Sequence, residues 1–313
     1  MSGSLAAGAA PGKVILFGEH SVVYGQPAIA AALGHGLGAT VESCDDGPWL
    51  RIPRWGSEGL EVRPSVDGKG DAMCSAFALA LRMTDLSLDA GVRVTVDGQL
   101  PLGVGLGSSA AFAVALLRGL ADQQGQQLSH QRLSEGAEAI ERIFHGNPSG
   151  LDHTVVITGQ CLHFNRGETP RFREVQLGAE LPIVIAWTPR AGTTREAVAQ
   201  LKARRDQCPV EYDELFGAMG RLADAGAAAL EAGDLQRIGT LFDLNHGYLN
   251  ACGVSSPANE KMVHLARSAG ALGAKLTGAG RGGASIALAP DDPNRVVEVL
   301  REAGFDALFT TVR

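Results

Sequence analysis

The sequence predicts a mixed α+β protein with two domains, residues 1–180 and 181–313. Its 313 residues, 45% hydrophobic and 19% charged, are enough to build two hydrophobic cores. Strand-like and helix-like segments both occur, but they do not alternate regularly enough for a doubly wound parallel sheet. After an apolar strand at 181–188 the sequence changes to long, alanine-rich helical stretches, so we place the domain boundary near residue 180.

Local signals place the elements of the first domain. The stretch "VRVTVDG" (92–98) alternates valine with polar residues and ends in a turn, which favours a strand. The alanine- and leucine-rich stretch 108–125 begins with serine and ends with glycine, as helices often do. The other expected elements are a second helix at 129–146, a turn and a short helix at 147–159, and a strand at 160–166.

The second domain begins with the strand "LPIVIAWT" (181–188) and continues with helices. Two strand-like pieces then flank a glycine-rich loop within 273–290. The expected helices lie at 194–204, 211–232, 234–250, 256–270 and 291–303, and a last strand lies at 306–312.

Charge and cysteine content exclude several classes of function. A net charge of −7 gives no basic surface for nucleic acid. No apolar run reaches membrane-spanning length, and the N-terminus lacks the basic start and apolar core of a signal peptide. We therefore expect a cytoplasmic protein without a membrane partner. Five cysteines with no CxxC spacing disfavour a disulfide framework or a structural zinc site.

The stretch "PLGVGLGSSAAF" (101–112) has the properties of a phosphate-binding loop. Its glycines permit close backbone approach, and the helix that begins near Ser108 offers free N–H groups and a positive dipole end. It matches neither the Rossmann nor the P-loop pattern, since the third glycine and the lysine that they require are missing. A plain strand-to-helix turn with a serine N-cap is the alternative on composition alone.

Three segments in register carry a family resemblance. They are "APGKVILFGEHSVVYGQPAIAAAL" (10–33), "PLGVGLGSSAA" (101–111) and "KLTGAGRGGASIAL" (275–288). In this order, and spanning nearly the whole chain, they resemble the three motifs of the GHMP kinase superfamily. The resemblance implies a two-domain fold, with an N-terminal ribosomal-S5-like domain and a C-terminal ferredoxin-like sandwich, and an expectation of dimerisation.

The first motif and "ERIFHGNPSGLDHTV" (141–155) are similar to the mevalonate kinase branch of the superfamily in particular. This implies phosphorylation of the 5-hydroxyl of (R)-mevalonate by ATP and Mg²⁺, a step of isoprenoid biosynthesis. Another kinase of the superfamily, acting on phosphomevalonate, a sugar or homoserine, is the nearest alternative. A phosphorylated acceptor would need basic residues that "FGEHSVVYGQP" does not supply. A non-catalytic sensor of the same fold is the alternative from another class.

The resemblance implies a nucleotide site in the second motif and a metal site beside it. Mg²⁺ prefers hard oxygen ligands and keeps several waters, so a hydroxyl, a carboxylate and the phosphates suffice. Ser109 and Glu141 are the implied ligands, with Glu138 as an alternative one turn away. The implied ATP-binding residues are Pro101, Leu102, Gly103, Val104, Gly105, Leu106, Gly107, Ser108, Ser109, Ala110 and Ala111.

Asp152 is the candidate base and Lys13 its candidate partner. A carboxylate with a pKa of about 4 is a weak base for an alcohol, so full deprotonation before attack is not expected. In a loose transition state the hydroxyl loses its proton late, and Asp152 would orient it and accept the proton as the bond forms. Lys13 would keep Asp152 ionised and stabilise the attacking oxygen.

The acceptor site is implied by resemblance alone. Glu19 and His20 follow the first motif strand, and His20 would bond the carboxylate or a hydroxyl of mevalonate. The resemblance also implies a loop threonine that hydrogen-bonds near Asp152. Thr194 is the candidate for it, and Thr193 is nearly as good. Arg190 is a further candidate to bind the carboxylate of mevalonate. Lys13 and Lys275 both lie in glycine-rich motifs of a lysine-poor chain, so we expect both to have a role. The implied acceptor residues are Glu19, His20, Thr194, Gly278 and Ala279.

Overall fold

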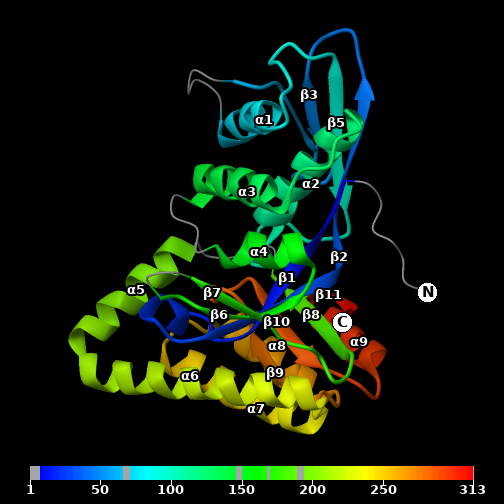
Figure 1. Cartoon of the computed structure of the whole chain (residues 1–313). Coiled ribbons are helices and arrows are strands. Elements are labelled where there is room, and N and C mark those ends of the chain that lie inside the picture. The colour runs from blue at the N-terminus through cyan, green and yellow to red at the C-terminus, as the bar shows by residue number, and fades with distance from the viewer. Residues whose placement is uncertain (1–7, 66–70, 146–149, 168–169, 189–193, 313) are drawn as a thin grey trace. The chain divides into compact units, whose positions relative to one another are not determined.

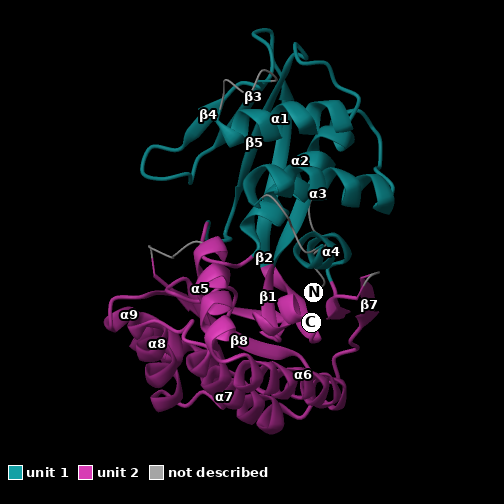
Figure 2. Cartoon of the chain, turned by 90° about the vertical axis from the view of Figure 1, so that its left-hand side faces the viewer, with its two compact units in different colours: residues 1–12, 35–102, 107–159 teal, residues 13–34, 103–106, 160–313 magenta. Residues whose placement is uncertain are grey.

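The computed structural model describes residues 8–65, 71–145, 150–167, 170–188 and 194–312 (Figure 1). The chain forms two compact units, each built from stretches that are far apart in the sequence (Figure 2). Unit 1 comprises residues 1–12, 35–102 and 107–159, and unit 2 comprises residues 13–34, 103–106 and 160–313. The predicted domain boundary near residue 180 divides the sequence into two continuous stretches, whereas the two units are each built from separate stretches. The boundary therefore stays a prediction.

Unit 1 contains strands in the order β4-β3-β5-β2. Strand β5 alternates as predicted, with Val92, Val94 and Val96 buried. It pairs antiparallel with β2 and parallel with β3, so the sheet is mixed. The strands are β2 (Ala28–Ser43, of which 35–43 lie in unit 1), β3 (Trp49–Ile52), β4 (Leu60–Val62) and β5 (Val92–Gly98).

The helices of unit 1 pack around α2 (Ser108–Gln123), which contacts β5 and the other three helices. Most of the buried residues of α2 are alanine and leucine. Gly136 on α3 allows that helix to approach α2 closely. A Cβ atom at Gly136 would lie 2.9 Å from Leu117 Cδ1, closer than packed carbon atoms come. The other helices are α1 (Ala72–Met83), α3 (His130–His145) and α4 (Leu151–Thr158).

Unit 2 contains an antiparallel four-stranded sheet in the order β11-β8-β10-β9. Helices α8 and α9 pack on this sheet through a core that includes Val184, Met262 and Leu300. Helix α7 packs along β9. The elements are β8 (Leu181–Trp187), β9 (Gly273–Leu276), β10 (Ala284–Leu288), β11 (Asp306–Val312), α7 (Leu235–Ala251), α8 (Pro257–Ser268) and α9 (Pro293–Glu302).

Unit 2 also includes the strand that carries the first motif. Strand β1 (Ala9–Phe17) pairs with β2 and passes into unit 2 at Lys13. Helices α6 and α7 pack together, and Phe216, Met219 and Leu249 belong to a second core. The remaining elements are η1 (Ser21–Tyr24), β6 (Cys161–Asn165), β7 (Arg171–Glu174), α5 (Thr194–Gln207) and α6 (Pro209–Ala232).

The mixed α+β class is confirmed, and the predicted strands and helices appear within a few residues of their expected ends. Gly146 and the "NPS" of the predicted turn lie outside the described residues. All five cysteines are free thiols, as expected. Burial raises the pKa of Cys161 and of Cys252 to about 12, which makes both thiols unreactive. Within the described ranges, no helix has the length and apolarity needed to cross a membrane.

Candidate active site

The three motifs meet inside unit 2 through hydrogen bonds, two of them between main-chain groups. The Lys13 N–H donates to the Leu106 carbonyl at 2.9 Å, which ties β1 to the second motif. The Ala284 N–H donates to the Val104 carbonyl at 3.2 Å, which ties the third motif to the second. The Thr277 hydroxyl accepts from the Ile15 N–H at 3.1 Å and donates to the Ile15 carbonyl at 3.0 Å. Segments from the start, middle and end of the chain therefore form one assembly.

The second motif presents its backbone and hides its side chains. Val104 and Leu106 are buried and anchor the loop, while Gly103 and Gly105 are exposed. Gly105 has a φ of +92°, which favours glycine, and the third motif comes close at this point. A Cβ atom at Gly278 would lie 3.5 Å from the Gly105 carbonyl oxygen. This exposed glycine backbone suits an anion that approaches closely.

Glu19 and Lys275 form an ion pair in the interior of unit 2, and each side chain is 0% exposed. The Lys275 ammonium also donates to the Leu276 carbonyl at 2.7 Å and to the Ile15 carbonyl at 3.3 Å. Asn245 donates from Nδ2 to the second Glu19 oxygen at 2.9 Å. Burial lowers the pKa of Lys275, and the negative charge of Glu19 opposes that shift. Both oxygens of Glu19 are therefore occupied by protein groups.

His20 follows Glu19 in an unusual backbone conformation. Its φ of +62° and ψ of −48° are rare for a residue with a side chain, and such strain is often found at functional sites. His20 Nε2 lies 3.0 Å from the Ala279 carbonyl oxygen, so Nε2 carries the proton and donates. Burial lowers the pKa of His20, which favours the neutral ring with Nδ1 as an acceptor.

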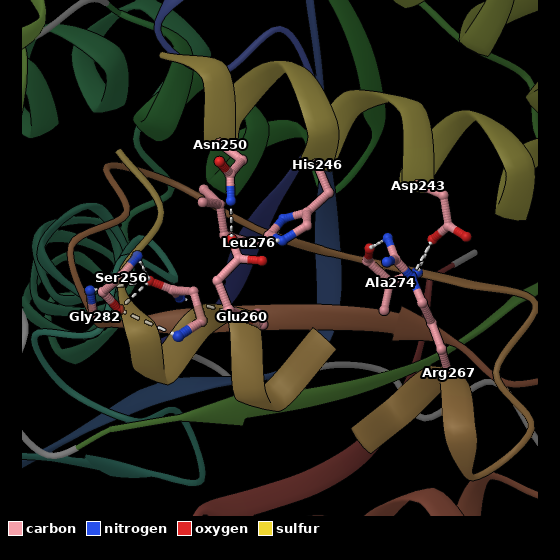
Figure 3. Close-up of polar contacts among 11 residues, drawn as sticks. Asp243, His246, Asn250, Ser256, Glu260, Arg267, Ala274, Leu276 and Gly282 are labelled. Atoms are coloured by element: carbon pink, nitrogen blue, oxygen red, sulfur yellow. Dashed lines mark hydrogen bonds and ion pairs between the residues drawn. The ribbon is translucent and has the colours of Figure 1, made fainter. Parts of the chain in front are cut away.

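A row of polar residues on α7 holds β9 (Figure 3). The Ala274 N–H donates to Asp243 at 2.9 Å, and the Leu276 N–H donates to His246 Nδ1 at 3.3 Å. Arg267 on α8 also donates to Asp243, at 2.7 Å. No family motif marks these residues in the sequence. Their signal is polar side chains at helical spacing within a stretch that is otherwise largely apolar.

Unit 1 holds the other candidate residues. Gly107, with a φ of +71°, precedes the N-terminus of α2, and Ser109 lies in the first turn. Ser109 Oγ lies 2.9 Å from His145 Nε2, at the last residue of α3. Glu141 lies four residues before His145, so both project from the same face of α3. Whether Ser109 and Glu141 share a metal ion stays a prediction.

Glu141 is buried and bound by a histidine of the next helix. His153 donates from Nδ1 to Glu141 Oε2 at 2.8 Å, and both side chains are 3% exposed. Asp152, the residue before His153, is half-buried in the first turn of α4. The structure thus pairs Ser109 with His145 and Glu141 with His153, two histidines that the sequence did not predict. Asp152 precedes His153 in the chain.

The remaining candidates fall as follows. Thr194 is the exposed first residue of α5, while Thr193 and Arg190 lie outside the described residues. Ala110 and Ala111 are buried in the first turns of α2. Lys13 is buried in unit 2, whereas Asp152 belongs to unit 1, so their pairing stays a prediction.

Two family models match the chain, on either side of residue 180. The "GHMP kinases N terminal domain" matches residues 72–160, and "GHMP kinases C terminal" matches residues 227–306. Together with the three assembled motifs and the full-length relatives described next, they place the molecule in a class: the chain belongs to the GHMP kinase family.

Within that class, the similar proteins that match over nearly the full chain include mevalonate kinases. The enzyme of Thermococcus sibiricus is 37% identical over 97% of this chain and 95% of its own length. That of Pyrococcus horikoshii is also 37% identical, over 97% of this chain and 94% of its own. The crystal structure of L. major mevalonate kinase in complex with R-mevalonate matches with a TM-score of 0.87 and 30% identity. That match covers 99% of this chain and 96% of the other.

Proposed function

We propose that the protein transfers the γ-phosphoryl group of ATP directly to the 5-hydroxyl of (R)-mevalonate, as mevalonate kinases do. The observation that carries the proposal is the assembly of all three motifs in unit 2, together with similarity to mevalonate kinases over nearly the full chain. We also propose a cytoplasmic location and a homodimer, on the sequence and family expectations alone.

The phosphates of ATP bind to the second motif in this proposal. The exposed backbone at Gly103 and Gly105 and the first N–H groups of α2 supply donors, and the helix dipole favours the negative charge. Buried Val104 and Leu106 keep the loop in place without entering the nucleotide site. The residues proposed to contact the nucleotide are those of 101–111, with Val104 and Leu106 contributing their backbone alone.

The donor set in unit 1 fits Mg²⁺. Glu141 offers a carboxylate oxygen and Ser109 a hydroxyl, which are hard ligands of the kind that Mg²⁺ prefers. His153 occupies Glu141 Oε2, which leaves Oε1 for the metal. When bound, Mg²⁺ would neutralise charge on the phosphate oxygens during transfer. Within the described residues, no group of three or more His, Cys, Asp or Glu side chains forms a metal cluster, which is consistent with a metal held largely by phosphates and water.

Asp152 accepts the proton of the 5-hydroxyl late in the transfer, and Lys13 stabilises the charge on the attacking oxygen. His20 Nδ1 accepts a hydrogen bond from a hydroxyl of mevalonate, because Nε2 already donates to Ala279. Glu19 contributes by holding the His20 loop, since both of its oxygens are occupied. In this proposal Gly278, Ala279 and Thr194, the first residue of α5, also contact mevalonate.

A coupled assay of ADP release with mevalonate, phosphomevalonate, galactose and homoserine tests the proposal. We expect turnover with mevalonate and little with the others. A preference for another acceptor would assign the chain to a different branch, and no turnover with any would favour a sensor. The Asp152→Asn variant should lose at least about 100-fold in kcat while it still binds ATP. Near-normal turnover of this variant would refute the assignment of the base.

A further inference from the structure

We propose that His153 is a positioning residue for the metal site, and that it couples the metal ligand Glu141 to the helix that carries Asp152. The inference rests on the proposed function, because that function makes Glu141 a metal ligand. Its basis is the 2.8 Å bond from His153 Nδ1 to Glu141 Oε2, between side chains that are both 3% exposed.

The pair lies on two helices that bury apolar residues on either side of it in the sequence. Ile140 and Ala137 on α3, and Val155 and Val156 on α4, are each 0% exposed. A carboxylate in such surroundings loses its hydration, and a hydrogen bond from one N–H replaces only part of it. Apolar side chains of similar size would fill this volume at lower cost. A polar pair at this position therefore points to a purpose other than packing.

That purpose follows from the geometry of a carboxylate. A glutamate side chain has three rotatable bonds, and a donor fixed to Oε2 sets the direction of Oε1. Groups behind a metal ligand commonly orient it in this way, and their loss weakens metal binding. His145 contacts the other proposed ligand in the same way that His153 contacts Glu141. Its Nε2 lies 2.9 Å from Ser109 Oγ.

The sequence position of His153 adds the coupling. Asp152 and His153 are consecutive in the first turn of α4, an eight-residue helix that begins after Gly150. A shift of this turn moves the proposed base and the donor to Glu141 together. The helix thus sets the position of the base and of the metal ligand at once, so a change at His153 alters metal affinity without removing any ligand.

The experiment measures metal binding apart from turnover. Mn²⁺ is titrated into the full-length protein saturated with AMPPNP, and free Mn²⁺ is followed by electron paramagnetic resonance. We expect His153→Leu to weaken Mn²⁺ binding by about ten-fold or more. His153→Asn, whose amide nitrogen can occupy the place of Nδ1, should stay within about three-fold of the parent protein. His153→Ser, too short to reach Glu141, gives the same comparison if the leucine variant does not fold.

Controls separate positioning from general damage. His130→Leu, at the exposed first residue of α3, should leave Mn²⁺ binding unchanged. Equal Mn²⁺ affinity in the leucine, asparagine and parent proteins would overturn the inference, as would unchanged affinity in Glu141→Gln. Equal weakening in the asparagine and leucine variants would overturn it as well. If the parent protein binds Mn²⁺ and AMPPNP with this pattern but does not phosphorylate mevalonate, the inference stands and the proposed function fails.

Discussion

Two buried glutamates, one in each unit, are held in different ways. In unit 2, Glu19 is paired with the ammonium of Lys275 at one oxygen and with the Asn245 amide at the other. In the described part of unit 1, the donor to Glu141 is the His153 imidazole, at Oε2. Burial of a carboxylate is costly unless charge and hydrogen bonds compensate it. The counter-cation of Glu19 is a residue of the chain itself, whereas Glu141 Oε1 is the oxygen that we propose for the metal.

This comparison supports the proposal that Glu19 has a structural role and that Glu141 is the metal ligand. Sequence position alone does not separate them, since both glutamates lie in or beside family motifs. The partners separate them, because Glu19 is 0% exposed with a protein donor at each oxygen, whereas His153 bonds one oxygen of Glu141. The first three substitutions below test this difference, and the fourth tests the contact between α7 and β9.

The largest effect is expected from Lys275→Met. It leaves the Glu19 carboxylate buried without its cation, and should lower the free energy of unfolding by about 3–5 kcal/mol. Urea denaturation followed by circular dichroism measures this. The double variant Glu19→Gln with Lys275→Met removes both charges and should regain most of the loss. A single variant as stable as the parent would show that Glu19 does not depend on Lys275.

The Glu141→Gln variant should separate metal binding from folding. Without metal we expect a change in the free energy of unfolding of less than about 1 kcal/mol, because the amide oxygen still accepts from His153. The Mg²⁺ concentration for half-maximal turnover should rise by about ten-fold or more. Glu138→Gln is the matched control on the same helix, where an exposed pair with Arg142 is removed. An equal rise in both variants would count against Glu141 as the ligand.

Asn245→Ala removes the second donor to Glu19 but leaves Lys275 in place. The unpaired buried oxygen should cost about 1–3 kcal/mol of unfolding free energy, less than the loss of the ammonium. Asn250→Ala, on the same helix, removes an exposed bond to Glu260 and should cost less than about 1 kcal/mol. Thermal unfolding at one fixed pH and salt concentration compares the two. Equal losses would mean that the buried bond to Glu19 contributes no more to the free energy of unfolding than the exposed bond to Glu260.

The smallest expected effect is a change in how stability depends on pH, caused by His246. Burial lowers the pKa of His246 from its ordinary value of 6.5, and Nδ1 must stay unprotonated to accept from the Leu276 N–H. Below about pH 6.5 the unfolded chain therefore takes up a proton that the folded chain refuses, and stability falls with falling pH. His246→Asn keeps an acceptor but cannot titrate. Between about pH 7 and 5 the free energy of unfolding should fall in both proteins. The fall in the variant should be about 1 kcal/mol smaller than the fall in the parent. Parallel curves would refute the prediction.

Much of the fold was predictable because its signals are local. Strand β5 alternates buried valines with polar residues, and α8 begins at a serine that caps it, Ser256. Strand β2 was not predictable in the same way, since "AIAAALGHGLGATVES" is rich in glycine and alanine, which are uncommon in strands. Helix α1, "AMCSAFALALRM", was also not predicted.

The candidate site was predictable only where motifs mark it. Lys13, Ser109, Glu141 and Asp152 were proposed by resemblance, and their roles stay predictions. The four-residue spacing of Glu141 and His145 on one helix was a signal that could have indicated His145, but it was not used. The partners of Glu19 were not predictable, because Asn245 and Lys275 lie 226 and 256 residues away and local patterns carry no information on such contacts.

The distance in sequence between β1 and its partners has a consequence for biosynthesis. Ile15 and Thr277 are 262 residues apart, and contacts of such separation form late because the intervening chain must first be made and ordered. The first motif leaves the ribosome early, but its acid gains a counter-cation only after Lys275 has emerged. Unit 2 cannot complete its interior before then, so we expect a nascent chain released ahead of that residue to be recognised by chaperones and proteases.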